Sequence, residues 1–586
     1  MTAAVPPAAP LPEPRTVAEA VGRAVAALGA GRAFGVVGSG NFHLTNALRA
    51  AGVPFTAARH EGGAATMADA WARSVAPGAD GRRPFAVVSL HQGCGFTNAL
   101  TGIGEAAKSR TPVLVLTADT ADGATASNFW VDQDAAAEAV GAVAMRVHRP
   151  ADAVAVVRAA VRRVVEDRRT VVLSVPIDVQ AMPAALDPTR PQPEPAPLAA
   201  PRRIRPDADS VARLVDLLEA ARRPVLIAGR GAVDAGPELR ALAEAAGAVL
   251  ATSAVVKGLF ADDEFSLGIP GGFSTPLAAE TIAAADLVIG VGCALNDWTT
   301  RHGRLIDPLA RIAQIDVDEQ ALGRLRPVAL GVVGDAALTA VDAAAELRAR
   351  LGDDPPARWR TPELAARIRE AGRWADLDLA DHGGDRSTTG GEDGAEARID
   401  PRRLTAELDR LLPAERVVAV DSGNSMGYPS QYLEVPAVGA FCFTQAFQAI
   451  GLGLATAIGA ALAQPERLPV LGTGDGGFAM AIAELETAVR LRLPLCIVVY
   501  NDAAYGAEVH HFTDASDDEL AGVVFPDVDF AAIARGFGAS GVAVRTVDDL
   551  AAVREWLDSE PEAPLVIDAK IAPDGGAWWL QEAFGH

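Results

Sequence analysis

The sequence lacks the features that place a chain in a membrane or on a nucleic acid. Its longest apolar stretch, AIGLGLATAIGAALA, has about 15 residues, mostly alanine and glycine, and a membrane-spanning helix needs about 20. The 52 lysines and arginines are outnumbered by 75 aspartates and glutamates, which gives a formal net charge of −23 without any basic run. A nucleic-acid binder normally carries a basic face. We therefore expect neither a membrane nor a nucleic acid as partner.

Cysteine is scarce, and its spacing resembles neither a zinc site nor a disulfide framework. The four cysteines are Cys94, Cys293, Cys442 and Cys496. Such isolated thiols are typical of a reduced cytoplasmic protein, in which they pack as small hydrophobic side chains. The N-terminal stretch MTAAVPPAAPLPEP has neither the basic nor the apolar region of a signal peptide. We therefore predict a cytoplasmic location and a flexible tail at residues 1–14.

Short apolar runs alternate with longer helical patterns along the whole chain. Examples are PFAVVSL, PVLIAG and LCIVVYND. This alternation predicts parallel sheets covered by helices on both faces. Two polar or proline-rich stretches interrupt it, and we interpret both as linkers. The prediction is an α/β protein of three doubly wound parallel-sheet domains at residues 15–185, 207–350 and 401–586, with linkers at 186–206 and 351–400, the second carrying an acidic, glycine-rich insert.

Acidic residues follow two of the predicted strands in the third domain. LPVLGTGDG is an apolar run that ends at Asp475, and LCIVVY ends at Asn501 and Asp502. Ligands of open parallel sheets sit outside the carboxyl ends of the strands, and a helix that begins there favours phosphate. Mg²⁺ is usually held by a few protein oxygens together with phosphate oxygens. The pattern indicates a magnesium diphosphate site, although a GDG tripeptide and an Asn-Asp turn are also ordinary features of loops.

Several longer segments, in order, give the chain a resemblance to a known family. GDG is followed after about 24 residues by an Asn-Asn-like pair, and four further segments agree with the same family: RHEGGAATMADAWAR (59–73), HQGCGFTNALTGIGEAAKSRTPVLVLTAD (91–119), ADLVIGVGCALNDWTT with IAQIDVDEQALG (285–323), and QAIGLGLATAIGA (448–460). Together they resemble thiamine diphosphate-dependent enzymes of the acetolactate synthase, pyruvate oxidase and benzoylformate decarboxylase group. The resemblance implies a pyrimidine-binding, a central and a diphosphate-binding domain, in that order.

The resemblance assigns roles on the pyrimidine side of the cofactor. Glu61 would hydrogen-bond N1′ of the aminopyrimidine and so help to activate C2, whereas outside this context a glutamate at a helix start merely favours the helix. Ile450 would support the bent form of the cofactor, or pack in a core as most isoleucines do. The backbone carbonyl of Gln448 would accept from the 4′-amino group, at a position where relatives often have glycine.

On the diphosphate side the resemblance assigns metal ligands and backbone contacts. Mg²⁺ would be bound by the side chains of Asp475 and Asp502 and by the carbonyl of Ala504. The common family pattern has asparagine where Asp502 stands, so this chain adds a negative charge beside the diphosphate. The other predicted cofactor contacts are Gly423, Asn424, Gly476, Gly477, Phe478 and Asn501.

Histidines are the candidates for controlling specificity. His91 follows the strand-like PFAVVSL, and benzoylformate decarboxylase-like sequences have a histidine in a similar context. It would act as a catalytic proton shuttle or simply hydrogen-bond a neighbouring loop. His510 and His511 either line the substrate entrance or are solvated loop residues. FAD, which some relatives bind, is less favoured, because the segment GCALNDWTTRHGR has Ala294 or Leu295 where they have an arginine.

The function implied is a thiamine diphosphate- and Mg²⁺-dependent, acetolactate synthase-like carboligase that decarboxylates a 2-oxo acid and passes the product to a carbonyl acceptor. Two alternatives stay open: a 2-oxo acid decarboxylase without ligase activity, and a catalytically silent regulatory paralogue. The resemblance also implies a homodimer or homotetramer, in which the pyrimidine domain of one subunit faces the diphosphate domain of another. The sequence names neither the donor nor the acceptor.

Overall fold

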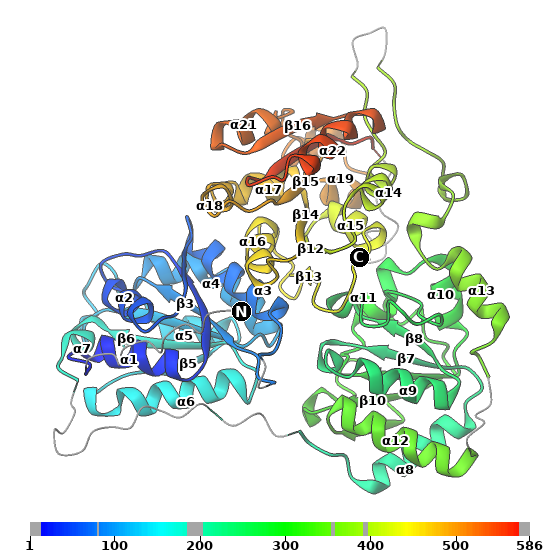
Figure 1. Ribbon diagram of the computed structural model, residues 1–586, viewed down its shortest axis with the longest axis horizontal. Helices are drawn as coiled ribbons and strands as arrows, with labels where there is room; N and C mark the ends of the chain where they lie inside the picture. The colour runs from blue at the N-terminus through cyan, green and yellow to red at the C-terminus, as the bar shows by residue number, and fades with distance from the viewer. Residues whose placement is uncertain are drawn as a thin grey trace, which may run out of the picture. The chain divides into compact units, whose positions relative to one another are not determined.

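Three parallel sheets alternate with helices along the chain (Figure 1). The computed structural model describes residues 13–78, 81–184, 198, 203–352, 358–390 and 396–573. These residues form two compact units. The first unit holds the first sheet and also the segment Ala446–Ala455, and the second unit holds the second and third sheets. The predicted α/β class with three doubly wound parallel sheets is confirmed.

The first sheet has six parallel strands in the order β2-β1-β3-β4-β6-β5. Every residue of its three central strands β3, β4 and β6 is buried, because helices cover both faces and leave no polar face for alternation. Its strands are β1 (Ala30–Gly35), β2 (Phe55–Ala57), β3 (Phe85–Leu90), β4 (Val113–Asp119), β5 (Val143–Arg146) and β6 (Val171–Pro176). Its helices are α1 (Val17–Ala27), α2 (Phe42–Ala50), α3 (Glu61–Ser74), α4 (Cys94–Lys108), α5 (Gln133–Ala139), α6 (Ala153–Val165) and α7 (Ile177–Ala181).

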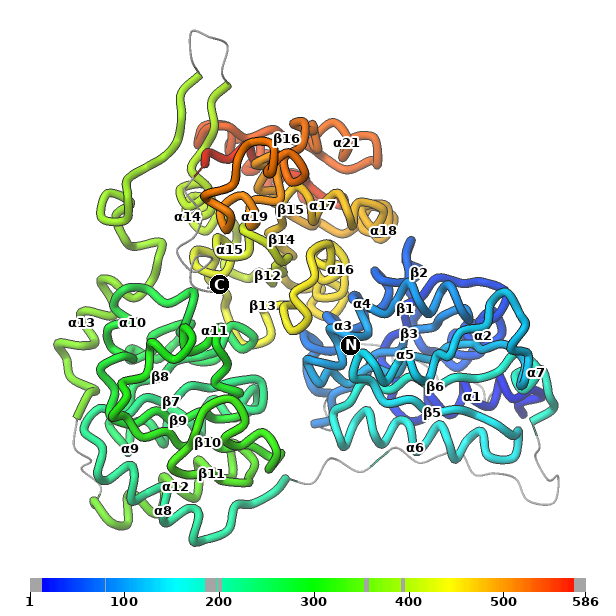
Figure 2. The backbone as a smooth tube through the Cα atoms, turned by 180° about the vertical axis from the view of Figure 1, so that it is seen from behind, coloured from blue at the N-terminus to red at the C-terminus, as the bar shows by residue number. Residues whose placement is uncertain are grey.

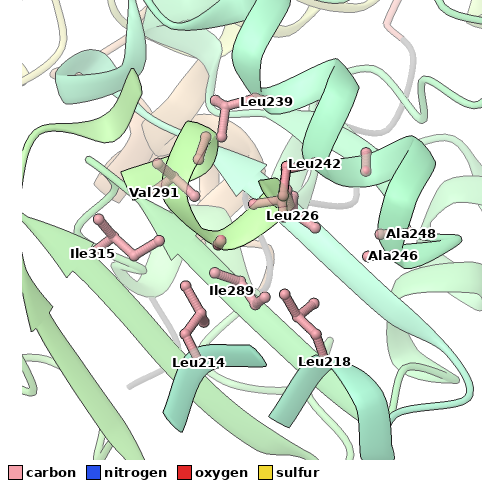
Figure 3. Close-up of a cluster of buried hydrophobic side chains, with 14 of the residues drawn as sticks. Leu214, Leu218, Leu226, Leu239, Leu242, Ala246, Ala248, Ile289, Val291 and Ile315 are labelled. Atoms are coloured by element: carbon pink, nitrogen blue, oxygen red, sulfur yellow. The ribbon is translucent and has the colours of Figure 1, made fainter. Parts of the chain in front are cut away.

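The second sheet has five parallel strands in the order β11-β10-β9-β7-β8. Successive strand residues face opposite sides, and the two faces belong to different cores. Leu226 packs with α8, α9 and α12, while its neighbour Val225 packs with α10 and α13. Figure 3 shows Leu214 and Leu218 of α8 near Ile289 in the first of these cores. The strands are β7 (Pro224–Ala228), β8 (Val249–Thr252), β9 (Leu287–Val291), β10 (Arg311–Asp316) and β11 (Leu330–Val333), and the helices are α8 (Ala208–Ala220), α9 (Gly236–Ala246), α10 (Pro276–Ala283), α11 (Asp297–Thr300), α12 (Ala336–Leu351) and α13 (Pro362–Ala371).

The third sheet, order β13-β12-β14-β15-β17-β16, repeats the strand order of the first (Figure 2). Its strands are β12 (Arg416–Val420), β13 (Phe441–Phe443), β14 (Leu468–Gly474), β15 (Cys496–Asn501), β16 (Ser540–Val544) and β17 (Leu565–Lys570). The helices around it are α14 (Pro401–Leu411), α15 (Gly427–Tyr432), α16 (Gly453–Ala463), α17 (Asp475–Ala481), α18 (Glu484–Arg490), α19 (Gly506–His511), α20 (Asp517–Leu520), α21 (Phe530–Phe537) and α22 (Ala551–Asp558), with the short 3₁₀ turn η8 (Asn424–Met426) before α15.

The strand order determines where a ligand can bind. In the first and third sheets the chain reverses direction across the sheet between the first strand and the third, β1 and β3 or β12 and β14. Crevices in doubly wound sheets open at this reversal, outside the carboxyl ends of the strands. His91 follows β3, η8 follows β12, and Asp475 follows β14. The fold therefore places most of the predicted site residues at these two positions.

Some predicted features differ from the structure. Strands β5 and β13 were not expected. Strand β5 is only half-buried and ends at Arg146, so it lacks the continuous apolar run by which the buried strands were found. Strand β13 has only three residues, and polar residues follow it directly at Thr444 and Gln445. The predicted linker at 351–400 contains α13, whose Leu364 and Ile368 are buried. Most of the tail at 1–14 and of the linker at 186–206 lies outside the described residues. Among the residues that are described, no helix has the length and apolarity that crossing a bilayer requires.

A buried lysine joins the second sheet to the third. The ammonium of Lys257, in the loop after β8, donates to the carbonyl of Ser430 at 2.9 Å and of Leu433 at 2.7 Å. These carbonyls lie at the C-terminal end of α15, where helix carbonyls lack partners within the helix. Burial lowers the pKa of Lys257. The Lys257 side chain therefore caps α15 and links the second sheet to the third within this unit.

The core of the second sheet gives a stability prediction. Ile289 on β9 is fully buried (Figure 3), so Ile289→Ala removes methyl groups from a packed interior and should cost about 2–5 kcal/mol of unfolding free energy. Urea unfolding followed by circular dichroism measures the change. Leu309, which is 92% exposed, supplies the control, since Leu309→Ala should stay within about 0.5 kcal/mol of wild type. Equal losses for both variants would contradict the core described here.

Candidate functional site

Two carboxylates meet at the ends of adjacent strands of the third sheet. Asp475 is the first residue of α17, directly after β14, and Asp502 directly follows β15. The two side chains are hydrogen-bonded to each other. Burial raises the pKa of Asp475 to about 6. Burial, and then the charge of Asp475, raise the pKa of Asp502 to about 8. Without a cation the pair therefore holds a proton near neutral pH, and a divalent ion would replace that proton.

Glycines let other parts of the chain pack closely around this carboxylate pair. A Cβ at Gly506 would strike Oδ2 of Asp502 and lie 3.5 Å from Cβ of Asn424, so the ends of β12 and β15 converge there. A Cβ at Gly476 would lie 2.5 Å from the Tyr505 ring, and one at Gly477 would strike the carboxylate of Asp421. The start of α17 thus accepts no side chain at Gly476 or Gly477, because Tyr505 and Asp421 lie against the backbone there.

The turn after β12 contributes polar atoms that have no partner in the described structure. Oδ1 of Asn424 and Oγ of Ser425 are both buried without a hydrogen bond, although buried polar groups are nearly always paired. Gly423 precedes them with φ +101° and ψ −171°, a conformation that is essentially restricted to glycine. A cation and a diphosphate would satisfy these atoms, so the residues present fit the predicted Mg²⁺ diphosphate group.

The described residues contain no cluster of three or more histidine, cysteine, aspartate or glutamate side chains suited to a metal. Mg²⁺ usually takes one or two carboxylates and completes its shell with phosphate and water oxygens, and the Asp475–Asp502 pair offers two. The backbone of Ala504 hydrogen-bonds to both carboxylates, which places it beside the pair. Whether its carbonyl binds the ion stays a prediction.

Asn501 has a structural task in this fold. Its amide nitrogen donates to Asp568 at 2.8 Å and to the carbonyl of Val528 at 3.2 Å, and its Oδ1 accepts the N–H of Ala503 at 3.1 Å. Asp568 also forms a buried ion pair with Lys570 at 3.0 Å. Asn501 therefore holds the turn that presents Asp502, and its predicted cofactor contact stays a prediction. Phe478 is buried and packs edge to face on Phe530, which leaves only its backbone for the diphosphate.

A second group of predicted residues gathers in the first unit. Glu61 begins α3, and its Oε2 accepts a hydrogen bond from Nδ2 of Asn98 at 3.0 Å. A Cβ at Gly95 would lie 3.2 Å from Oε1 of Glu61 and 3.1 Å from Cβ of His91. Glu61 and His91, predicted from separate segments, therefore flank the same glycine. Gly95 leaves the space beside the second oxygen of Glu61 without a side chain.

His91 is held in one orientation by its neighbours. Its Nδ1 lies 2.8 Å from the carbonyl of Gln92, which can only accept, so Nδ1 carries a hydrogen. Its Nε2 lies 3.4 Å from the hydroxyl of Ser39, and the ring meets Phe129 edge to face at 5.1 Å. A Cβ at Gly38 would lie 2.5 Å from the ring. Nε2 thus points toward Ser39 in the loop after β1, at the reversal of the first sheet.

Gln448 has an unusual backbone. Its φ is +57°, in the left-handed region, where a residue with a Cβ is disfavoured by roughly 1–2 kcal/mol. Glycine adopts this conformation freely, which gives a physical reason for the glycine that relatives often have there. Gln448 and the half-buried Ile450 both belong to the segment Ala446–Ala455 of the first unit. Their contacts with cofactor remain predictions.

Other predicted positions stand apart from these groups. His510 and His511 end α19, whose first residue Gly506 adjoins Asp502. Leu295, which with Ala294 was one of the two positions compared with an arginine of flavin-binding sequences, is buried in the core of the second sheet. A cavity of about 590 Å³ lies elsewhere in the second unit, lined among others by Lys257 and Trp374. None of the predicted site residues lines it.

Sequence reasoning missed several residues of these groups. Asp421 and Ser425 belong to the same strand-end turn as Gly423 and Asn424, so the stretch DSGNS could have pointed to them. Asp421 accepts hydrogen bonds from the backbone of Ser422 and the hydroxyl of Thr473, both at 2.9 Å. Asn98 lies in the segment 91–119 that carries the family resemblance, but its contact with Glu61 depends on how α3 and α4 pack.

Comparisons with known proteins match three consecutive parts of the chain. Sequence models described as the N-terminal TPP binding, central and C-terminal TPP binding domains of thiamine pyrophosphate enzymes match residues 15–139, 211–343 and 421–569. The chain is 30% identical to the sulfoacetaldehyde acetyltransferase of Rhodobacter capsulatus, over 97% of this chain and 96% of that protein. It is 31% identical to a "Probable 2-ketoarginine decarboxylase" of Pseudomonas aeruginosa, over 91% and 90%. It is 28% identical to the acetolactate synthase large subunit of Parasynechococcus marenigrum, over 83% and 76%.

The carboxylate pair predicts a pH-dependent stability of the cation-free protein. Because folding raises the pKa of Asp475 and Asp502 above their usual value, the folded state binds more protons than the unfolded state from about pH 4 to pH 8, and stability falls as pH rises through that window. In Asp502→Asn the fall in stability between pH 4 and pH 8 should be smaller, because only one of the two carboxyl groups remains. Thermal unfolding of chelator-treated protein between pH 5 and 8 measures it.

The matched control is Asp514→Asn, at an exposed position. Both variants remove one negative charge, so the difference between their pH slopes isolates the buried pair. A slope for Asp502→Asn equal to that of Asp514→Asn would show that the two carboxylates do not share a proton.

Proposed function

Because the chain belongs to the thiamine pyrophosphate enzyme family, we propose that it is a thiamine diphosphate- and Mg²⁺-dependent carboligase that decarboxylates a 2-oxo acid and joins the remaining acyl unit to a carbonyl acceptor. The observation that carries the proposal is the Asp475–Asp502 pair beside the unpartnered Asn424 and Ser425. The pair would hold Mg²⁺, and α17 and the turn after β12 would hold the diphosphate.

The residues of the first unit supply the proton chemistry. Bound thiamine diphosphate provides an electron sink for the carbanion that remains after CO₂ leaves. One oxygen of Glu61 is occupied by Asn98, and the other faces the space at Gly95. This free oxygen would exchange a proton with the ring nitrogen N1′ of the cofactor. The carbonyl of Gln448 would orient the 4′-amino group, and Ile450 would support the bent form of the cofactor.

The reaction can be tested by reconstitution. Purified protein is incubated with thiamine diphosphate, Mg²⁺ and either pyruvate or an aromatic 2-oxo acid, with and without an aldehyde acceptor. We expect CO₂ together with a 2-hydroxyketone. Retention of the cofactor without CO₂ from any 2-oxo acid would overturn the proposed reaction, and failure to retain the cofactor would overturn the cofactor assignment. A parallel incubation with sulfoacetaldehyde addresses acetyl transfer, for which several of the relatives are named.

Glu61 is the residue on which turnover should depend most. Glu61→Gln keeps an oxygen for Asn98 but cannot take up a proton, so kcat should fall by about 10²–10⁴, the usual range for a general acid–base group. Affinity for thiamine diphosphate, measured by calorimetry, should change little. Glu138→Gln, on the exposed side of α5, is the control and should turn over like wild type. Unchanged turnover in Glu61→Gln would favour the catalytically silent alternative.

The orientation of His91 keeps the simple decarboxylase as a second candidate. Release of an aldehyde requires a proton on the carbon that carried CO₂. Because the hydrogen on Nδ1 of His91 is bonded to the carbonyl of Gln92, Nε2 would have to take up a proton from solvent first and then deliver it to that carbon. If the protein is a decarboxylase, His91→Ala should lower aldehyde formation by about 10² or more. For a carboligase we expect the ratio of 2-hydroxyketone to aldehyde to rise, because the protonation that competes with ligation is slowed. Gas chromatography of the products gives this ratio.

A further inference from the structure

One buried carboxylate holds the segment that carries Gln448 and Ile450. Glu105, near the C-terminal end of α4, is fully buried. Its Oε1 accepts the backbone N–H of Ala446 at 3.1 Å, and its Oε2 accepts the N–H of Phe447 at 2.6 Å. Two successive peptide groups are therefore fixed by one side chain. Because hydrogen bonds to a charged acceptor are short and strong, this contact defines where the segment begins.

The ring of Phe447 adds a second contact to the same helix. It lies beside Gly104, where a Cβ would come within 2.9 Å of the ring, and the ammonium of Lys108 is 5.1 Å from the ring centre. Gly104 and Lys108 are four residues apart, so they lie on one face of α4. The segment thus contacts α4 through both its backbone and a side chain.

Glu105 is itself fixed from the side of α3. Arg73 of α3 pairs with Glu105 at 2.8 Å and with Asp69 at 2.6 Å, and Ser109 donates to Glu105 at 3.2 Å. Burial alone would raise the pKa of Glu105, but Arg73 and the two backbone N–H groups outweigh it, so its pKa lies below the usual value. The carboxylate is therefore charged at neutral pH and cannot turn away from the segment without leaving Arg73.

The same helix pair also carries the proposed catalytic carboxylate. Asn98, which donates to Glu61, precedes Glu105 by seven residues, two helical turns or about 10 Å along α4. Gly102, between them, lets the helices pack closely, since a Cβ there would lie 2.8 Å from Cβ of Ala65 on α3. Glu61 and the anchor of the segment are therefore parts of one rigid helical pair.

We infer that Glu105 is a positioning residue, which acts through Ala446 and Phe447 to set Gln448 and Ile450 against the aminopyrimidine half of the cofactor. The inference rests on the proposed function, because it assumes that the segment contacts thiamine diphosphate. Glu105 does not touch the cofactor. The carboxylate pair and the turn after β12 belong to the other unit and do not depend on it.

The test separates the two halves of the cofactor. In Glu105→Gln one acceptor oxygen becomes an NH₂ group that faces a backbone N–H, so the segment should detach. We expect thiamine diphosphate to bind about tenfold more weakly, and hydrogen–deuterium exchange at its C2 to slow about tenfold or more even at saturating cofactor, since misplacement of about 1 Å costs up to 10² in rate. Inorganic pyrophosphate with Mg²⁺, measured by calorimetry, should bind as to wild type.

A second variant reaches the segment without touching a charge. In Gly104→Ala the added methyl group would clash with the Phe447 ring while Glu105 stays unchanged. C2 exchange should therefore slow in the same way. This variant provides the test if Glu105→Gln fails to fold. Glu138→Gln, on an exposed face, is the control and should exchange like wild type. Wild-type exchange in a folded Glu105→Gln or in Gly104→Ala would overturn the inference, as would a parallel loss of pyrophosphate binding. If wild type itself binds no thiamine diphosphate, the proposed function fails instead.

Discussion

The functional part of this molecule depends on two carboxylates that parallel strands bring together. Neighbouring parallel strands end at the same edge of a sheet, so Asp475 and Asp502 meet although 27 positions separate them in the sequence. Their repulsion in a buried place is unfavourable unless a proton or a cation intervenes. Around them Gly476, Gly477 and Gly506 let Tyr505, Asp421 and Asp502 itself lie directly against the backbone. This edge of the third sheet therefore suits a positive charge, a proton or a cation, between the two carboxylates.

Much of the architecture could be predicted from hydrophobic pattern. Strands such as β4 and β15 are continuous apolar runs because both faces of their sheets are covered, and all five strands of the second sheet were expected. The strand-end placement of Asp475 and Asp502 followed from the same reasoning. β5 and β13 were not expected: β5 is half-buried and ends in an arginine, unlike the equally short but apolar and expected β8. The helix α13 was missed because its polar flanks made the whole stretch look like a linker.

The candidate site was predictable only where it is local in sequence. The stretch that contains Glu61 and the turn after β14 are short motifs with their own signal. The bond between Asn98 and Glu61 and the bonds from Ala446 and Phe447 to Glu105 arise from helix packing, which no local pattern encodes. Asp502 illustrates another limit: its position was clear from the strand, but its coupling to Asp475 and the resulting shift in protonation depend on burial and geometry.

The lysine that caps α15 has a consequence for recombining parts of such proteins. Lys257 lies in the loop after β8 of the second sheet, and its ammonium donates hydrogen bonds to the carbonyls of Ser430 and Leu433. These carbonyls lie at the end of α15, the helix that follows the turn of Asn424. A central domain transplanted from a relative would bring its own residue at this position, against a helix end that was not selected with it. A chimaera that takes Lys257 and the α15 carbonyls from the same parent protein should keep these hydrogen bonds. A chimaera that takes them from different parents would leave either a buried ammonium or buried carbonyls without a partner.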